Sequence, residues 1–147
     1  MKNIALFITI CIALYSCNNH SKVKSSFNFI GKWELTGHGI MDGIIVKIEY
    51  NKEKKLIGKV CQLNDNKLVN MFLDSNSVFI SSIERRSQFQ FILKEKKIGS
   101  ELFDLYGLDT RSVFQAQFRD KDTIVLSKDQ SNTNINGSLT KLIRIKE

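Results

Sequence analysis

The sequence contains no proline, so its turns must be made by glycine, asparagine and aspartate, which tolerate positive φ. These residues interrupt the chain at Asp42-Gly43, Asn64-Asp65-Asn66 and Asn136-Gly137. Such interruptions recur about every 8–12 residues between short apolar runs, which is typical of antiparallel strands joined by tight turns.

The motifs of several common enzyme classes are also missing. There is no Gly-x-Ser-x-Gly nucleophile elbow, no His-x-x-x-His pair and no glycine-rich phosphate loop. Histidine occurs only as His20 and His38. His38 and Asp42 could supply two metal ligands, but two ligands do not make a site. We therefore expect no enzymatic activity, no catalytic residue, no metal and no cofactor.

Long apolar runs are scarce, and the one at the start of the chain covers only residues 4–15, after Lys2. Crossing a bilayer takes roughly 20 apolar residues, so this run indicates a cleaved signal peptide. It ends in Leu14-Tyr15-Ser16-Cys17, which resembles the lipobox of bacterial lipoproteins, although Tyr15 stands where a small residue is usual. The alternative is an ordinary secretory signal that happens to contain a cysteine.

The lipobox resemblance implies three segments: a signal peptide at 1–16, a lipidated tether at 17–28 and a folded domain at 29–147. It implies that Cys17 is acylated and attaches the protein to a membrane. In related lipoproteins, acidic residues after the cysteine direct inner-membrane retention or surface export, and residues 18–22 contain none. The implied location is the cell envelope, on the periplasmic face of an outer membrane.

The net charge of +7 does not come from one basic patch. Lys52, Lys54 and Lys55 surround Glu53 at an apparent turn, and short basic runs of this kind are usually solvated. Together with export, this argues against nucleic acid as a partner. The weaker alternative is attraction to anionic lipid or polysaccharide.

Cysteine occurs three times. Cys11 lies in the signal segment and Cys17 would carry lipid, so Cys61 has no partner for an internal disulfide. Because an exposed thiol is a liability in an oxidising compartment, the sequence predicts that Cys61 is buried.

Apolar and polar residues alternate with a period of two through most of residues 29–147, which indicates strands with one buried face. The strictest example is Phe114-Gln115-Ala116-Gln117-Phe118, and no segment has a convincing amphipathic helix pattern. The expected strands are 31–35, 44–49, 56–63, 67–73, 78–83, 89–93, 102–108, 114–118, 123–126 and 139–145.

This pattern predicts an all-β domain. Consecutive short strands favour an antiparallel up-and-down β-barrel of about 8–10 strands, which closes on itself and leaves no exposed edge. A Greek-key sandwich is the alternative. It would normally need several long crossovers, and the only long connection here is 127–137.

Gly31-Lys32-Trp33 opens the first expected strand. A Gly-x-Trp at this place resembles the lipocalin and related calycin families. In those families the tryptophan closes one end of the barrel, and a basic residue of the last strand lies over its ring. The resemblance implies a lipocalin-like barrel in which Arg144 takes that position. Alternatively, Trp33 is an ordinary core aromatic and Arg144 a surface charge.

Residues 43–64 also look like a family of small secreted bacterial proteins of unknown function (the DUF2147 type). Those proteins begin with a Gly-x-Trp and continue with a hairpin that ends in a Gly-x-Val stretch, as in Gly58-Lys59-Val60. Their cysteine-bearing insertion is missing here, so the likeness covers the first third of the chain. It points to the same architecture and supplies no catalytic residue.

Several phenylalanines could line a small apolar cavity, or they could equally fill the interior. The first functional expectation is a lipid-anchored envelope protein that binds a small apolar ligand or serves in envelope maintenance. The alternative is a non-enzymatic interaction module, an inhibitor or accessory subunit, that uses a loop end such as 36–43. A filled interior with an exposed apolar patch at a loop end would favour the module. The candidate lining residues are Phe89, Phe91, Phe103, Phe114 and Phe118.

Overall fold

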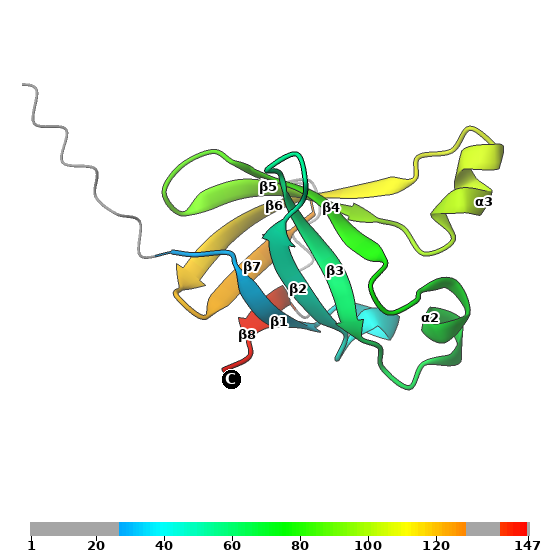
Figure 1. Cartoon of the computed structure of the whole chain (residues 1–147), viewed down its shortest axis with the longest axis horizontal. Coiled ribbons are helices and arrows are strands. Elements are labelled where there is room, and N and C mark those ends of the chain that lie inside the picture. The colour runs from blue at the N-terminus through cyan, green and yellow to red at the C-terminus, as the bar shows by residue number, and fades with distance from the viewer. Residues whose placement is uncertain (1–26, 129–138, 147) are drawn as a thin grey trace, which may run out of the picture.

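The computed structural model describes residues 27–128 and 139–146 of the 147-residue chain. Within them, eight strands form a closed barrel, in which each strand pairs with the next along the chain and β8 returns to β1 (Figure 1). The strands are β1 Gly31–Thr36, β2 Ile45–Tyr50, β3 Leu56–Gln62, β4 Val78–Arg85, β5 Gln90–Lys96, β6 Arg111–Asp120, β7 Thr123–Ser127 and β8 Thr140–Arg144.

Every neighbouring pair of strands is antiparallel, including the β1–β8 pair that closes the barrel. At the closure, Trp33 lies opposite Arg144, and Leu35 lies opposite Leu142. A closed barrel satisfies the hydrogen-bonding groups that an open sheet would expose at its edges. The predicted all-β, up-and-down barrel is confirmed, with eight strands at the lower end of the expected range.

Two of the expected strands, 67–73 and 102–108, are instead helical over α2 Lys67–Phe72 and α3 Ser100–Leu105. The Asn66 side chain caps α2 by accepting hydrogen bonds from the backbone N–H groups of Leu68 and Val69. Both helices lie in connections outside the barrel wall, where no neighbouring strand offers a ladder. Local capping by Asn66 therefore favours the helix at α2, whereas α3 begins at Gly99, which has positive φ and no capping side chain. A short 3-10 helix, η2 Gly39–Met41, lies between β1 and β2.

The barrel interior is made of aliphatic and aromatic side chains. In β6 the predicted alternation is present, because Phe114, Ala116 and Phe118 are buried while Gln115 and Gln117 are exposed. The largest fully buried side chains are Trp33, Leu35, Ile44, Val46, Ile48, Val60, Phe79, Ile80, Phe91, Leu93, Ile124 and Leu142.

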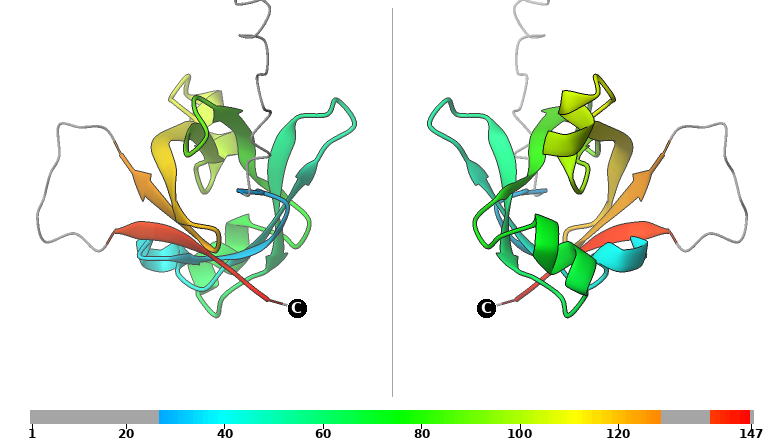
Figure 2. Two further views of the ribbon diagram at one scale, coloured as in Figure 1. Left: turned by 90° about the vertical axis from the view of Figure 1, so that its left-hand side faces the viewer. Right: turned by 90° about the vertical axis from the view of Figure 1, so that its right-hand side faces the viewer.

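The two ends of the barrel differ. The hairpin end is formed by the tight β2–β3, β4–β5 and β6–β7 turns. Residues 27–30, which directly precede β1, also lie at this end. The loop end is formed by η2, α2 and α3, which connect the other strand ends. In Figure 1 the chain enters the barrel at the left, and α2 and α3 lie at the right; the right-hand view of Figure 2 faces the loop end.

Cys61 is exposed, so the prediction of a buried thiol is wrong. The strand register explains the difference. Val46 pairs with Val60, but the preceding residue Ile45 pairs with Gln62, so Cys61 lies in the irregularity between the two pairs. Val60 faces the core with no exposed surface, and the residue after it points outward.

Candidate functional site

The hairpin end is closed by a stacked pair. Trp33 has no exposed surface, and its indole Nε1 donates a 2.7 Å hydrogen bond to the carbonyl oxygen of Phe29. The Arg144 guanidinium carbon lies 4.1 Å from the centroid of the Trp33 ring. The structure therefore brings together the two residues that the sequence singled out for closure of the barrel.

Arg144 also holds the segment that enters the barrel. Its guanidinium donates hydrogen bonds to the carbonyl oxygens of Ile30, at 2.8 Å, and Asn28, and its Nε lies 3.4 Å from a carboxylate oxygen of Asp122. Gly31 has φ 134°, and a Cβ on it would lie 2.8 Å from an Arg144 nitrogen. The glycine of the Gly-x-Trp motif is thus required by the close approach of this side chain.

The five phenylalanines proposed as cavity lining do not share one environment. Phe91, Phe114 and Phe118 are buried in the interior. Phe89 is 46% exposed, and Phe103 lies on α3 and is 37% exposed. Phe89 lies in a hairpin turn and Phe103 lies on a helix outside the wall, so these two rings lie apart from the three in the interior.

The aromatic side chains at the hairpin end pack against one another. The ring of Phe29 lies 4.8 Å from that of Phe91 and 5.0 Å from that of Phe118, and Phe91 and Phe118 are 5.5 Å apart. Phe27 adds contacts of 5.0 Å with Phe89 and 5.1 Å with Phe118. These are ordinary distances for packed aromatic rings, so the rings occupy this part of the interior themselves.

A buried acidic side chain lies toward the loop end of the interior. Among the described residues, Glu95 of β5 is the one buried charged residue, at 4% exposed. It follows Phe91 and Leu93 on the inward face of the strand. His38, in the turn after β1, places its Nε2 3.0 Å from a carboxylate oxygen of Glu95. The result is a largely buried histidine–glutamate pair across the barrel.

The turn that carries His38 is itself held in place. Gly37 and Gly39, on either side of His38, both have positive φ. The His38 backbone N–H donates to the Asp42 carboxylate, and the Thr140 hydroxyl donates to the carbonyl oxygen of Gly37 at 3.0 Å. Asp42 therefore holds the backbone at His38. Among the described residues, no three His, Cys, Asp or Glu side chains are grouped as metal ligands would be.

The surroundings of His38 have opposing effects on the pKa of its imidazole. Burial lowers the pKa of its imidazole, and the nearby Lys128 ammonium lowers it further. The hydrogen bond with Glu95 and the charge of that carboxylate act more strongly the other way, so the pKa of His38 is raised above 6.5. The positively charged form of the imidazole is thus stabilised, and protonated His38 would form an ion pair with Glu95 that ties the turn at 37–42 to β5.

Glu95 was not among the residues singled out from the sequence. The expected strand at 89–93 ended before it, whereas β5 extends to Lys96. Extending the period-two pattern from Phe91 and Leu93 by one step would have placed Glu95 on the buried face.

Many large apolar side chains are exposed on the helical segments of the loop end. Leu105 and Tyr106 are each 80% exposed, and Met71 is 71% exposed. The two helical segments approach each other, because a Cβ on Gly99, just before α3, would lie 4.0 Å from the ring of Phe72. We refer to this set as the loop-end apolar surface: Ile40, Leu68, Met71, Phe72, Leu102, Phe103, Leu105, Tyr106 and Leu108.

Comparison with known proteins adds no relative: no protein-family model, no curated protein and no solved structure matches this chain. In residues 27–128 and 139–146, none of the helices has the length and apolar character needed to cross a bilayer. The predicted signal peptide and Cys17 lie outside the described residues.

Proposed function

We propose that this protein is a lipid-anchored cell-envelope protein whose lipocalin-like barrel is a non-enzymatic interaction module, an inhibitor or accessory subunit. The barrel would contact a partner protein through its loop end. The observation that carries the proposal is the loop-end apolar surface, because soluble domains rarely expose so many large apolar side chains in one region without a binding role.

The position of this surface relative to the anchor supports the same function. The described chain begins at Phe27, at the hairpin end, and η2, α2 and α3 lie at the other end (Figure 1). A lipid on Cys17 would therefore attach through the tether to the hairpin end. The loop end would then point away from the membrane, toward proteins in the adjoining compartment.

The lipocalin likeness rests on Trp33 and Arg144. Their stack ties the first strand to the last, as the resemblance implied. Binding of a small apolar ligand inside the barrel is the less well supported function. Phe91 and Phe118 pack on each other and on Phe29, and Phe103 lies outside the wall.

Photo-cross-linking in cells tests the proposal. A photoreactive amino acid at Leu105 should form a discrete adduct with one protein, whereas the same group at Tyr50 should not. Tyr50 is a matched control, because it is 62% exposed and lies at the hairpin end. The substitution Met71→Ser in the same chain should reduce the Leu105 adduct. Absence of a discrete adduct at Leu105, or equal adducts at both positions, would contradict the interaction module.

Native mass spectrometry of the same protein addresses the ligand alternative. The interaction module predicts the mass of the protein with its lipid and no additional small molecule. A co-purified apolar compound that stays with the barrel would instead support ligand binding.

A further inference from the structure

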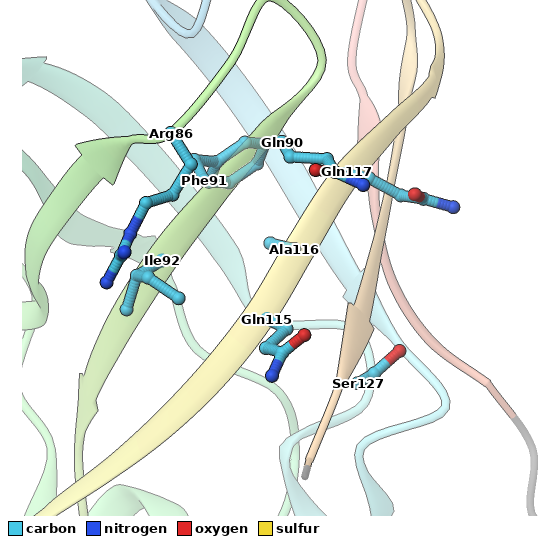
Figure 3. A pocket seen from close by; sticks show the side chains of 8 residues that line it. All are labelled: Arg86, Gln90, Phe91, Ile92, Gln115, Ala116, Gln117 and Ser127. Atoms are coloured by element: carbon cyan, nitrogen blue, oxygen red, sulfur yellow. The ribbon is translucent and has the colours of Figure 1, made fainter. Parts of the chain in front are cut away.

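The outer wall of the barrel carries a hollow that is separate from the loop end. It has a volume of about 310 Å³ and lies over β5 and β6, with Arg86 and Ser127 at its sides. Ligand sites range from about 300 to 1,000 Å³, so the hollow suits a small ligand. Figure 3 shows Gln90 beside Gln117 at one end of the hollow, and Gln115 near Ser127 at the other.

Strand pairing produces this arrangement. Gln90 of β5 lies directly opposite Gln117 of β6, and Gln115 lies opposite both Ile92 of β5 and Ser127 of β7. Because inward and outward residues alternate, the three glutamines share the outer face while Phe91 and Ala116 face the core. The amides are therefore presented side by side on a rigid wall.

The amide groups are available to a ligand. Within residues 27–128 and 139–146, the side chains of Gln90, Gln115 and Gln117 have no hydrogen-bond partner in the protein. Each amide offers a carbonyl acceptor and an NH₂ donor, which matches a hydroxyl or acetamido group that both donates and accepts. Ile92, which lies opposite Gln115, also lines the hollow. Its side chain offers an apolar contact to a C–H face or a methyl group of the ligand.

The wall does not suit a peptide that binds as an added strand. The backbone groups of β5 and β6 are paired on both sides, because β5 lies between β4 and β6, and β6 lies between β5 and β7. Strand addition needs a free sheet edge. A ligand in this hollow must therefore be recognised by side chains, and three of the lining side chains are neutral amides.

From these observations we propose that the hollow lined by Gln90, Gln115, Gln117, Ile92, Arg86 and Ser127 binds a neutral saccharide through its hydroxyl or acetamido groups. The site is independent of the loop end. A partner at the loop end and a glycan on the wall could be bound by the same barrel at once.

NMR titration of the full-length protein in detergent micelles tests this site. The probe is tri-N-acetylchitotriose, with maltotriose as a second arm that lacks the acetamido groups and a trialanine peptide as a third. We expect weak, about millimolar binding of chitotriose, with the largest shifts in the backbone amides of β5 and β6. Binding of maltotriose as well would assign recognition to hydroxyl groups, and its absence would assign it to the acetamido group.

The double variant Gln115→Ala/Gln117→Ala should weaken saccharide binding about fivefold or more, because it removes two amide groups. Gln62→Ala is the matched control, since Gln62 is an exposed glutamine on β3 away from the hollow, and it should leave binding unchanged. The proposal is overturned if neither saccharide shifts β5 and β6, if both variants bind alike, or if trialanine binds at this wall as well as the saccharides do.

Discussion

Arg144 of the last strand lies directly opposite Trp33 of the first strand, with its guanidinium carbon 4.1 Å from the centre of the indole ring. The pair lies at the line where the sheet closes into a barrel. One side chain therefore stacks on the core aromatic, holds residues 28–30 and reaches the β6–β7 turn through Asp122. The same side chain thus contributes both to the β1–β8 closure and to the packing of the hairpin end.

The Trp33–Arg144 stack predicts a coupled loss of stability. Arg144→Ala should lower the free energy of unfolding by about 1–2 kcal/mol through the lost stack and packing of its stem. Trp33→Ala should lower it by about 3–5 kcal/mol, as expected for a large aromatic removed from a core. Denaturant unfolding of the single and double variants should show non-additivity. Arg119→Ala, at an exposed residue of β6, is the control and should change stability by no more than about 0.5 kcal/mol.

Gly58 should not tolerate a side chain. A Cβ there would lie 2.7 Å from Val46 Cγ1 and 2.9 Å from side-chain atoms of Ile80, both buried in the core. Gly58→Ala should therefore destabilise the barrel by about 1–3 kcal/mol through overpacking. Thermal unfolding measures the effect, with Gln62→Ala on the same strand as the exposed control. Equal stability of Gly58→Ala and the wild type would refute the close packing of β3 against β2 and β4.

The His38–Glu95 pair predicts a pH dependence of stability. The pKa of His38 is raised in the folded protein, mainly because the stabilising effect of Glu95 exceeds the opposing effect of burial. Protonated His38 therefore stabilises the fold fully below its unfolded pKa, and this contribution is lost as the pH rises through its folded pKa. The stability gap between wild type and His38→Gln should therefore shrink as the pH rises from the unfolded pKa of about 6.5 through the higher folded pKa of His38.

Urea unfolding at several pH values measures that gap. Glu95→Gln should abolish the same pH dependence, because it removes the charge that stabilises the imidazolium ion. Asp42, which accepts the His38 backbone hydrogen bond, and Lys128 remain in both variants and cancel in the comparison. A gap that stays constant or widens with pH would show that His38 is not held in its charged form.

Membrane attachment should depend on Cys17, which lies outside the described residues. Cys17→Ala should release the protein from membranes or block its maturation, since acyl chains contribute about 0.8 kcal/mol per buried CH₂. Membrane fractionation and intact-mass measurement follow both effects. Cys61→Ala is the matched control, because Cys61 is an exposed thiol of the barrel and should not affect attachment. Wild-type protein that is soluble and begins at another residue would exclude the lipoprotein assignment.

Much of the barrel could be predicted because its strands are amphipathic. In β6, alternating phenylalanine and glutamine separate an inner from an outer face before any tertiary contact is considered. Trp33 and Arg144 were found as a pair because a known motif relates the first and last strands. Their distance, and the bonds from Arg144 to residues 28 and 30, required the folded chain.

Other features could not be obtained from local patterns. Residues 67–73 and 102–108 are apolar enough to pass for strands, but the closed β1–β8 sheet leaves them no partner, and Asn66 caps the first of them as a helix. The surroundings of Cys61 depend on an irregular register between β2 and β3.

By itself, the sequence determined the all-β class, the up-and-down order and the inward faces of most strands, because period-two alternation and turn residues act over a few neighbours. The tertiary structure decided which residues meet across the barrel. It placed Glu95 beside His38, gathered apolar residues of α2 and α3 at one end, and lined up the three glutamines of the outer wall. Each of these depends on the register between strands and on barrel closure, which join residues far apart in the chain.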